Sequence, residues 1–151
     1  MANGKVHKVV GTAAGASAAL YRARRRPLLD QLIEGAGGAL GGYLGGQLPD
    51  VLEPAIHSWH RDLCHSWSAS GAISAGLAKF SGWERACREK AAWYRNIRLA
   101  SGAEPGKAFL HALAELFWNF VAGLFAGVAA GYLSHLALDA QTPRGLPLLG
   151  T

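Results

Sequence analysis

LFWNFVAGLFAGVAAGYLSHLAL, the stretch from Leu116 to Leu138, decides the fold because it runs for 23 residues without a formal charge. A helix needs about 20 predominantly apolar residues to cross a membrane. Asn119 and His135 are the polar exceptions within the stretch. The pattern predicts a membrane-spanning helix, and the alternative is the buried core helix of a soluble bundle.

The composition of the whole chain points in the same direction. Charged residues make up 17% of the 151 residues, against roughly 25% in ordinary soluble domains. Many of the 20 glycines fall in apolar stretches, above all GAGGALGGYLGG from Gly35 to Gly46. Small residues let helices approach closely within membranes, whereas in a soluble helix each glycine costs about 1 kcal/mol relative to alanine. We therefore expect one membrane-associated helical domain over residues 1–151.

Apolar segments recur along the chain with helical rather than strand-like spacing. Apolar helices are predicted at about 9–21, 28–47, 66–80 and 108–138, and a polar helix at 84–99 is followed by the turn SGAEPG. No segment alternates regularly in the manner of a strand. The expected fold is an all-α, up-and-down bundle of about four apolar helices plus one polar helix.

The formal net charge of +5 would suit nucleic acid or anionic lipid. No nucleic-acid-binding motif accompanies the charge, so nucleic acid is an unlikely partner, and a membrane lipid is expected instead. The first residues, MANGKVHKVV, lack the apolar core of a cleaved signal peptide. Cys64 and Cys87 form no CxxC pair and no disulfide framework, so they do not indicate a compartment.

An up-and-down bundle sorts the ionisable residues between its two ends. The end at which the chain starts collects His7, Asp50, Glu53, His57, His60, His65, His135 and Asp139. The opposite end collects Arg22, Arg24, Arg25, Arg26, Lys79, Arg85, Arg88, Lys90, Arg95, Arg98 and Lys107. Random scattering would rarely put five of the six histidines at one end and eleven of the fifteen basic residues at the other, and the separation predicts a site at the histidine end.

Two motifs carry the chemistry of that site. PDVLEPAIHSWHRDLCHS, from Pro49 to Ser66, holds the candidate carboxylates Asp50 and Glu53 and three histidines in a segment predicted as a loop leading into a helix. Imidazole and carboxylate together suit zinc and other first-row divalent ions. The alternative is a polar surface loop with solvated histidines. A single histidine would favour this alternative, whereas a cluster of three histidines with carboxylates favours a metal site.

HLALD, from His135 to Asp139, places two further candidate ligands on one helix face, because residues four apart in a helix are neighbours. The alternative is a capping or intrahelical ion pair, but a histidine is costly in an apolar helix unless it has a function. His7 alone would mean little, and only the helical hairpin returns it to this end. A second pair with this spacing, His111 and Glu115, falls near the basic end, where Glu115 is expected to be paired rather than catalytic.

These motifs, in this order, resemble a known family. VHKVVGTAAGA, LPDVLEP, HRDLCHS and GYLSHLALDAQTPRGLPLL are similar to elements of the YdjM-like family of predicted inner-membrane metal-dependent hydrolases, and the resemblance covers nearly the whole chain. Cys64 stands where threonine is common and Asp62 where glycine is common, which leaves the ligand positions intact. The family is thought to share its helical metal-site plan with zinc-dependent phospholipase C and P1-type nucleases.

The resemblance implies metal ligands at the matching positions His7, Asp50, His60, His65, His135 and Asp139, with Glu53 at a partly shared acidic position. We expect a hydrolase of phosphoester or lipid-like substrates in the bacterial inner membrane, with a soluble cytoplasmic bundle as the alternative location. Zn²⁺ is the expected cofactor, with Mn²⁺, Ni²⁺ or Fe²⁺ also suited. Asp50 or Glu53 is the candidate catalytic base.

Two other functions remain open at this stage. A non-enzymatic membrane protein could use the metal as a structural staple or move ions, and a closed ligand shell would distinguish a structural site from a catalytic one. A soluble lipid- or partner-binding bundle without metal is the third reading. Neither the substrate nor the oligomeric state follows from the sequence.

Overall fold

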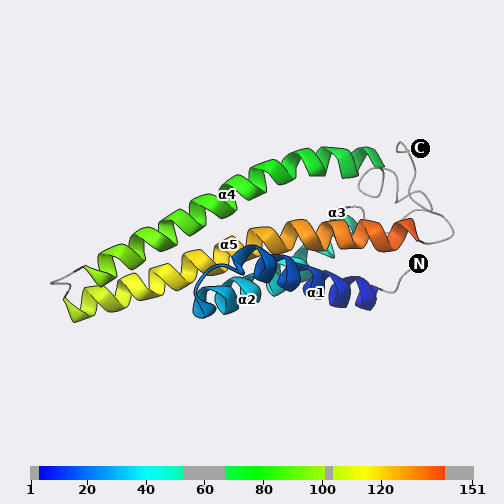
Figure 1. The fold of residues 1–151 in the computed structure, drawn as a ribbon. Coiled ribbons are helices and arrows are strands. Elements are labelled where there is room, and N and C mark those ends of the chain that lie inside the picture. Colours follow the sequence, from blue (N-terminus) through cyan, green and yellow to red (C-terminus); the bar gives the residue numbers. More distant parts are fainter. Residues whose placement is uncertain (1–3, 53–66, 101–103, 142–151) are drawn as a thin grey trace.

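Helices make up the regular structure of the protein. The computed structural model describes residues 4–52, 67–100 and 104–141. The long helices α1 (Gly4–Ala23), α2 (Leu28–Gly45), α4 (Trp67–Leu99) and α5 (Pro105–Ala140) run alternately in opposite directions, and α3 (Leu48–Leu52) is a short turn of helix after α2 (Figure 1). No strand occurs in these three ranges. The predicted all-α, up-and-down bundle is confirmed.

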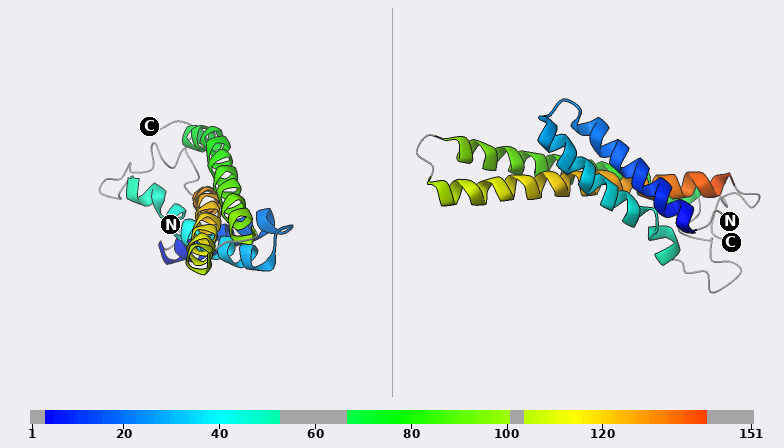
Figure 2. Two further views of the ribbon diagram at one scale, coloured as in Figure 1. Left: turned by 90° about the vertical axis from the view of Figure 1, so that its left-hand side faces the viewer. Right: turned by 90° about the horizontal axis from the view of Figure 1, so that it is seen from below.

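One helix replaces two that the sequence predicted separately. The apolar segment 66–80 and the polar segment 84–99 form the continuous 33-residue helix α4. The change in composition near Gly82 suggested a break, but no proline interrupts the backbone there, and one glycine costs a helix only about 1 kcal/mol. The prediction of two helices was therefore wrong. Together α4 and α5 form a long hairpin that extends beyond the shorter hairpin of α1 and α2 (Figures 1 and 2).

The segment at Pro49 also differs from its prediction. It was expected to be a loop, but Leu48–Leu52 form α3. Proline is tolerated in the first turn of a helix because the backbone N–H that it lacks would have no intrahelical partner there. Asp50 is therefore presented by a short helix. Residues 53–66 lie outside the described ranges, so the structure does not place Glu53, His57, His60 or His65.

Glycines bring the backbones of three helices into contact. α2 packs against both α1 and α5. A Cβ atom added to Gly42 would lie 2.1 Å from the carbonyl oxygen of Gly11 in α1, and one added to Gly127 in α5 would lie 2.2 Å from the carbonyl oxygen of Gly38. The glycine run of α2 thus allows the close helix approach that its sequence predicts.

The distribution of polar and apolar side chains is inverted relative to a soluble protein. Leu28, Leu32 and Phe117 are 70%, 57% and 57% exposed, whereas the largest fully buried side chains include Glu34 and Asn119. Soluble domains bury their large apolar residues, while polar groups within a membrane face the bundle interior. Among the described residues, α5 is the one helix long and apolar enough to span a membrane, and its most apolar 18-residue stretch has a mean hydropathy of 1.6. That 18-residue stretch is 44% buried, so much of its surface faces outward.

Candidate metal centre

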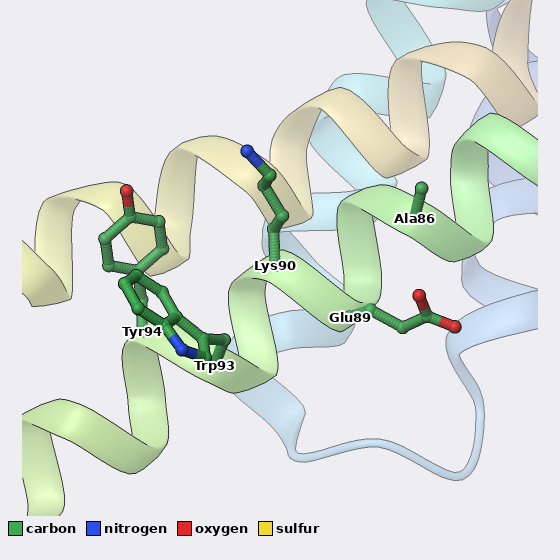
Figure 3. A pocket seen from close by; sticks show the side chains of 5 residues that line it. All are labelled: Ala86, Glu89, Lys90, Trp93 and Tyr94. Atoms are coloured by element: carbon green, nitrogen blue, oxygen red, sulfur yellow. The ribbon is translucent and has the colours of Figure 1, made fainter.

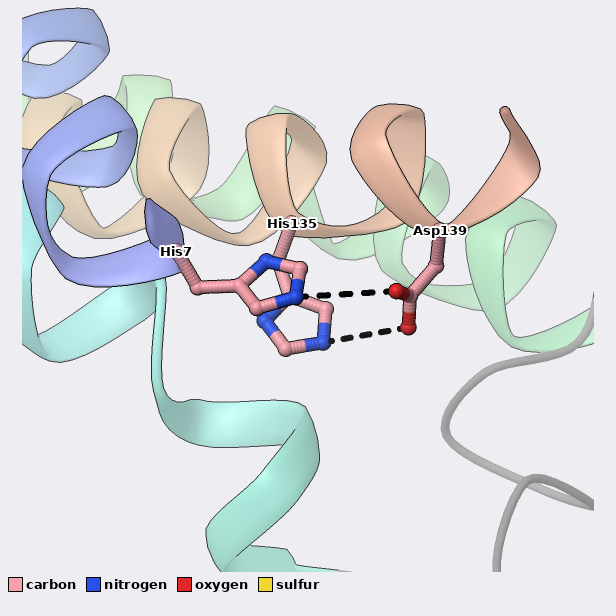
Figure 4. A group of neighbouring side chains, drawn as sticks. All are labelled: His7, His135 and Asp139. Carbon is pink, nitrogen blue, oxygen red and sulfur yellow. Dashed lines mark ion pairs between the residues drawn. The ribbon is translucent and has the colours of Figure 1, made fainter. Parts of the chain in front are cut away.

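The first turn of α1 and the last turns of α5 meet at one end of the bundle, where two histidines face one carboxylate (Figure 4). His7 comes from α1, and His135 and Asp139 come from α5. They are 4%, 0% and 1% exposed. Because α1 packs along α5, residues from opposite ends of the chain share one buried site.

Both imidazole rings of this cluster lie close to the carboxylate of Asp139. His7 Nε2 lies 3.5 Å from Asp139 Oδ1, and His135 Nε2 lies 3.5 Å from Asp139 Oδ2. The two imidazole rings are stacked with their centroids 3.8 Å apart, and one ligand atom from each residue lies within 4.8 Å of the others. Ligands of one tetrahedral zinc ion, each about 2.0–2.1 Å from the metal, lie roughly 3.3–3.4 Å from each other. The cluster therefore has the dimensions of a cage for one ion.

A backbone carbonyl orients His135. Its Nδ1 lies 2.7 Å from the carbonyl oxygen of Gly46, just after α2. A carbonyl can only accept, so this hydrogen bond places the proton on Nδ1, and in the neutral ring Nε2 then carries a lone pair. Metal-binding histidines are commonly oriented in this way. The lone pair points toward Asp139, as the labelled side chains show (Figure 4).

Asp50 adds a fourth candidate ligand on the solvent side. Its Oδ1 lies 3.6 Å from His135 Nε2, and its side chain is 51% exposed. The structure thus brings together four of the seven residues that the sequence nominated: His7, Asp50, His135 and Asp139. The other three, Glu53, His60 and His65, lie in the segment 53–66 outside the described residues.

A second buried polar cluster lies further along the bundle, and the sequence analysis missed it. It is an ion-pair network in which four carboxylates, each at most 5% exposed, contact five arginines. The carboxylates are Asp30, Glu34, Glu84 and Glu115, and the arginines are Arg22, Arg26, Arg88, Arg95 and Arg98. These arginines were expected to form a basic end, but their charges are compensated. The available signal was the pair Asp30 and Glu34, spaced four apart in a glycine-rich helix.

The centre of this network links three helices. Arg95 of α4 contacts both Asp30 of α2 and Glu115 of α5, and Asn119 donates to Asp30 over 3.1 Å. Burial alone would raise the pKa of Asp30, but hydrogen bonds and positive charge from Arg95 and Arg26 outweigh it and hold that pKa below its usual value. The hydrogen bond to Asp30 is in turn the main cause that raises the pKa of Arg95. As expected, Glu115 is paired.

The two polar clusters lie toward the two ends of the uncharged part of α5. Asn119 belongs to the ion-pair network and His135 to the histidine cluster. These residues are separated by roughly 24 Å along the helix at 1.5 Å per residue. The hydrocarbon core of a bilayer is about 30 Å thick. The spacing therefore suits a network near one membrane surface and a histidine cluster near the other.

A separate cavity of about 540 Å³ lies on the outer part of α4, lined by Ala86, Glu89, Lys90, Trp93 and Tyr94 (Figure 3). Lys90 Nζ lies 4.9 Å from the ring centroid of Trp118 on α5. The lining includes no histidine, and its one carboxylate, Glu89, is exposed. It offers no set of convergent metal ligands, so the histidine cluster is the candidate chemical site.

Comparison with known proteins identifies a family along the whole length of the chain. A family model described as YdjM inner membrane protein matches residues 1–150. No curated protein and no solved structure matches the chain.

Proposed function

The chain belongs to the YdjM inner membrane protein family, and from this membrane location and the histidine cluster we propose that it is a metal-dependent hydrolase. The observation that carries the proposal is the convergence of His7, His135 and Asp139. All three are buried, and one ligand atom from each lies within 4.8 Å of the others. Their separation suits a single ion.

The protonation pattern of His135 supports a cation at the cluster. With its Nδ1 proton directed at Gly46, neutral His135 presents a lone pair toward the oxygens of Asp139 and Asp50. A metal ion at the cluster would accept this lone pair, with the neighbouring carboxylates as further ligands.

The donor set favours zinc. Imidazole nitrogens with carboxylate oxygens are common zinc ligands, and Mn²⁺, Ni²⁺ and Fe²⁺ accept the same groups. A bound ion of this kind supplies a water of pKa near 7 and polarises a phosphoryl or acyl oxygen. His7, His135 and Asp139 would hold the ion, and the hydrogen bond to Gly46 would fix the ring of His135.

Asp50 has a different part from the buried ligands. Its exposed carboxylate, 3.6 Å from His135 Nε2, lies where a substrate would approach, and it can serve as the fourth ligand or as the general base that accepts a proton from water. Glu53 is the second candidate base, and His60 and His65 are further candidate ligands. The proposed substrates are phosphoesters or lipid-like molecules, as in zinc-dependent phospholipase C and P1-type nucleases.

The burial of His7, His135 and Asp139 also favours a second candidate, a structural metal site or an ion-transport role without catalysis. A structural site is closed by protein ligands, whereas a catalytic one keeps a position for water. The exposure of Asp50 favours the catalytic alternative, because an exposed carboxylate beside the cluster can exchange protons with water.

Metal content is the first test of the proposal. Protein purified in detergent without chelator should contain about one divalent ion or more per chain. Asp139→Asn should lose most of it, and Glu104→Gln, the same kind of change at an exposed carboxylate, should keep it. Wild-type protein that takes up no zinc, manganese, nickel or iron would overturn the proposal.

Catalysis is tested on the same samples. Metal-loaded protein should hydrolyse bis(p-nitrophenyl) phosphate, chelation should stop the reaction, and added zinc should restore it. Asp50→Asn should lower turnover more than metal content. Full metal occupancy without hydrolysis of phosphodiesters or of phospholipids would favour the structural alternative.

A further inference from the structure

A groove runs between α1 and α4 over the surface of α5. In the described part of the chain both helices pack against α5, and an ion pair between Arg22 of α1 and Glu84 of α4 connects them. The groove contains an apolar cavity of about 150 Å³. Ala126, Ala129 and Ala130 of α5 contribute small side chains to its lining, and Phe80 and Leu133 contribute large ones.

A basic mouth adjoins this apolar groove. A second cavity, of about 310 Å³, is lined by Arg22 at the end of α1, by Arg24 just after it, and by Arg85 and Arg88 on α4. Arg22 and Glu84 line both cavities, so the basic mouth and the apolar groove are continuous. Arg24 and Arg88 lie on the mouth side of this junction, and Phe80 and Leu133 lie on the groove side.

The charges of the mouth are only partly compensated. Glu84, 2% exposed, is paired with Arg22 and Arg88 and fixes both guanidinium groups. Arg24 stacks over the ring of Tyr21 and donates to its carbonyl oxygen. Within the described ranges neither Arg24 nor Arg85 has an ion-pair partner. Two exposed guanidinium groups therefore line a cavity in which the one carboxylate, Glu84, is already paired with other arginines.

We propose that this groove binds an anionic phospholipid, with the phosphate between Arg24 and Arg85 and one acyl chain along α5. Arginine recognises phosphate through paired N–H donors. The apolar part follows a helix that can span a membrane, and from Ala126 to Leu133 it covers roughly 10 Å of helix length. A soluble phosphate would leave this part unused.

The excess of arginine and lysine at this end of the bundle predicts that the mouth faces the cytoplasm, where the membrane surface carries such lipids. Arginine and lysine favour the cytoplasmic side of membrane proteins, and anionic lipids attract basic segments there. Glu84 and Arg88 belong both to the lining of the mouth and to the ion-pair network, so the mouth lies beside that network and not beside the histidine cluster. The proposed lipid is therefore a bound stabilising partner rather than the substrate of the metal site.

Native mass spectrometry of the detergent-purified protein tests the proposal. Phosphatidylglycerol should bind at least tenfold more tightly than phosphatidylcholine with the same acyl chains. The double variant Arg24→Gln/Arg85→Gln should lose this preference, while Arg25→Gln/Lys107→Gln, which removes the same charge outside the groove, should keep it. Equal binding of the two lipids, or equal loss in both double variants, would overturn the proposal.

Two further measurements separate a lipid from a soluble anion. Ala129→Leu should fill the apolar groove and weaken binding of phosphatidylglycerol, whereas Ala137→Leu, at an exposed position of the same helix, should not. Glycerol 3-phosphate should compete only at far higher concentration than the lipid. Competition at similar concentration, or insensitivity to Ala129→Leu, would refute the acyl-chain part. Metal content serves as a fold check, since none of these residues touches the histidine cluster.

Discussion

Replacing Gly42 by alanine should weaken both the helix packing and the metal centre. The new Cβ atom would lie 2.1 Å from the carbonyl oxygen of Gly11 and 2.9 Å from Gly15 Cα, and ordinary contact begins near 3.4 Å. Both obstacles are backbone atoms, so no side chain can rotate away. α1 and α2 must therefore separate by more than about 1 Å.

The size of the effect follows from two opposing terms. Overpacking of a tight interface costs typically about 1–3 kcal/mol, and the upper value applies where backbone meets backbone. Alanine regains about 1 kcal/mol of helix propensity over glycine. Gly42→Ala should thus destabilise the fold by about 2 kcal/mol. Gly82→Ala provides the matched control, because a Cβ atom there meets nothing within 4 Å, and it should stabilise by about 1 kcal/mol.

Thermal unfolding in detergent, followed by circular dichroism, measures the difference. For a domain of this size 1 kcal/mol shifts Tm by roughly 2–4 °C, so the two variants should melt roughly 6–12 °C apart, on opposite sides of the wild type. Gly11 lies one helical turn from His7, so Gly42→Ala should also lower metal affinity. Equal Tm values for the two glycine variants would refute the packing argument.

Three further outcomes are expected. His7→Ala should lower metal affinity, measured by calorimetric titration, at least about tenfold. His111 lies against Tyr94, and His111→Ala should leave the affinity unchanged. The lowered pKa of Asp30 means that its ion pairs stabilise the fold above pH 3.8 and are lost as pH falls through the folded-state pKa, so Asp30→Asn should flatten the dependence of Tm on acid pH. In cysteine-free protein in intact cells, an impermeant thiol reagent should label Ala140→Cys, and Arg25→Cys only after lysis. The opposite labelling pattern would invert the orientation.

The fold was predictable where one signal dominated. The uncharged run Leu116–Leu138 predicted α5 correctly. The helix extends a few residues beyond its predicted bounds of about 108–138. The junction near Gly82 was not predictable, because composition changes there without any residue that forbids a helix. The turn of helix at Leu48–Leu52 was missed because Pro49 was interpreted only as the residue that stops the preceding helix. Proline is also tolerated in the first turn of a new helix.

The candidate site was predictable to the extent that it depends on helix geometry. The spacing of His135 and Asp139 puts both on one face, and the up-and-down topology returns His7 to them. The role of the Gly46 carbonyl could not be read from the sequence, because every residue has a carbonyl and only the fold selects one. The ion-pair network was missed because its carboxylates and arginines are brought together across helices.

The two polar clusters and the glycines between them solve one physical problem. In a membrane, helices gain little from burying apolar surface against each other, because lipid tails are equally apolar. Close glycine packing and buried polar contacts must then hold α1, α2 and α5 together. The ion-pair network fixes one end of these helices, and the direct contact of Gly11 with Gly42 sets the distance between α1 and α2 near the other. An ion held by His7, His135 and Asp139 would connect the N-terminal turn of α1 to the end of α5, where no carboxylate–arginine pair is described. Removing the metal should therefore increase proteolysis at the start of α1 more than at the turn between α1 and α2.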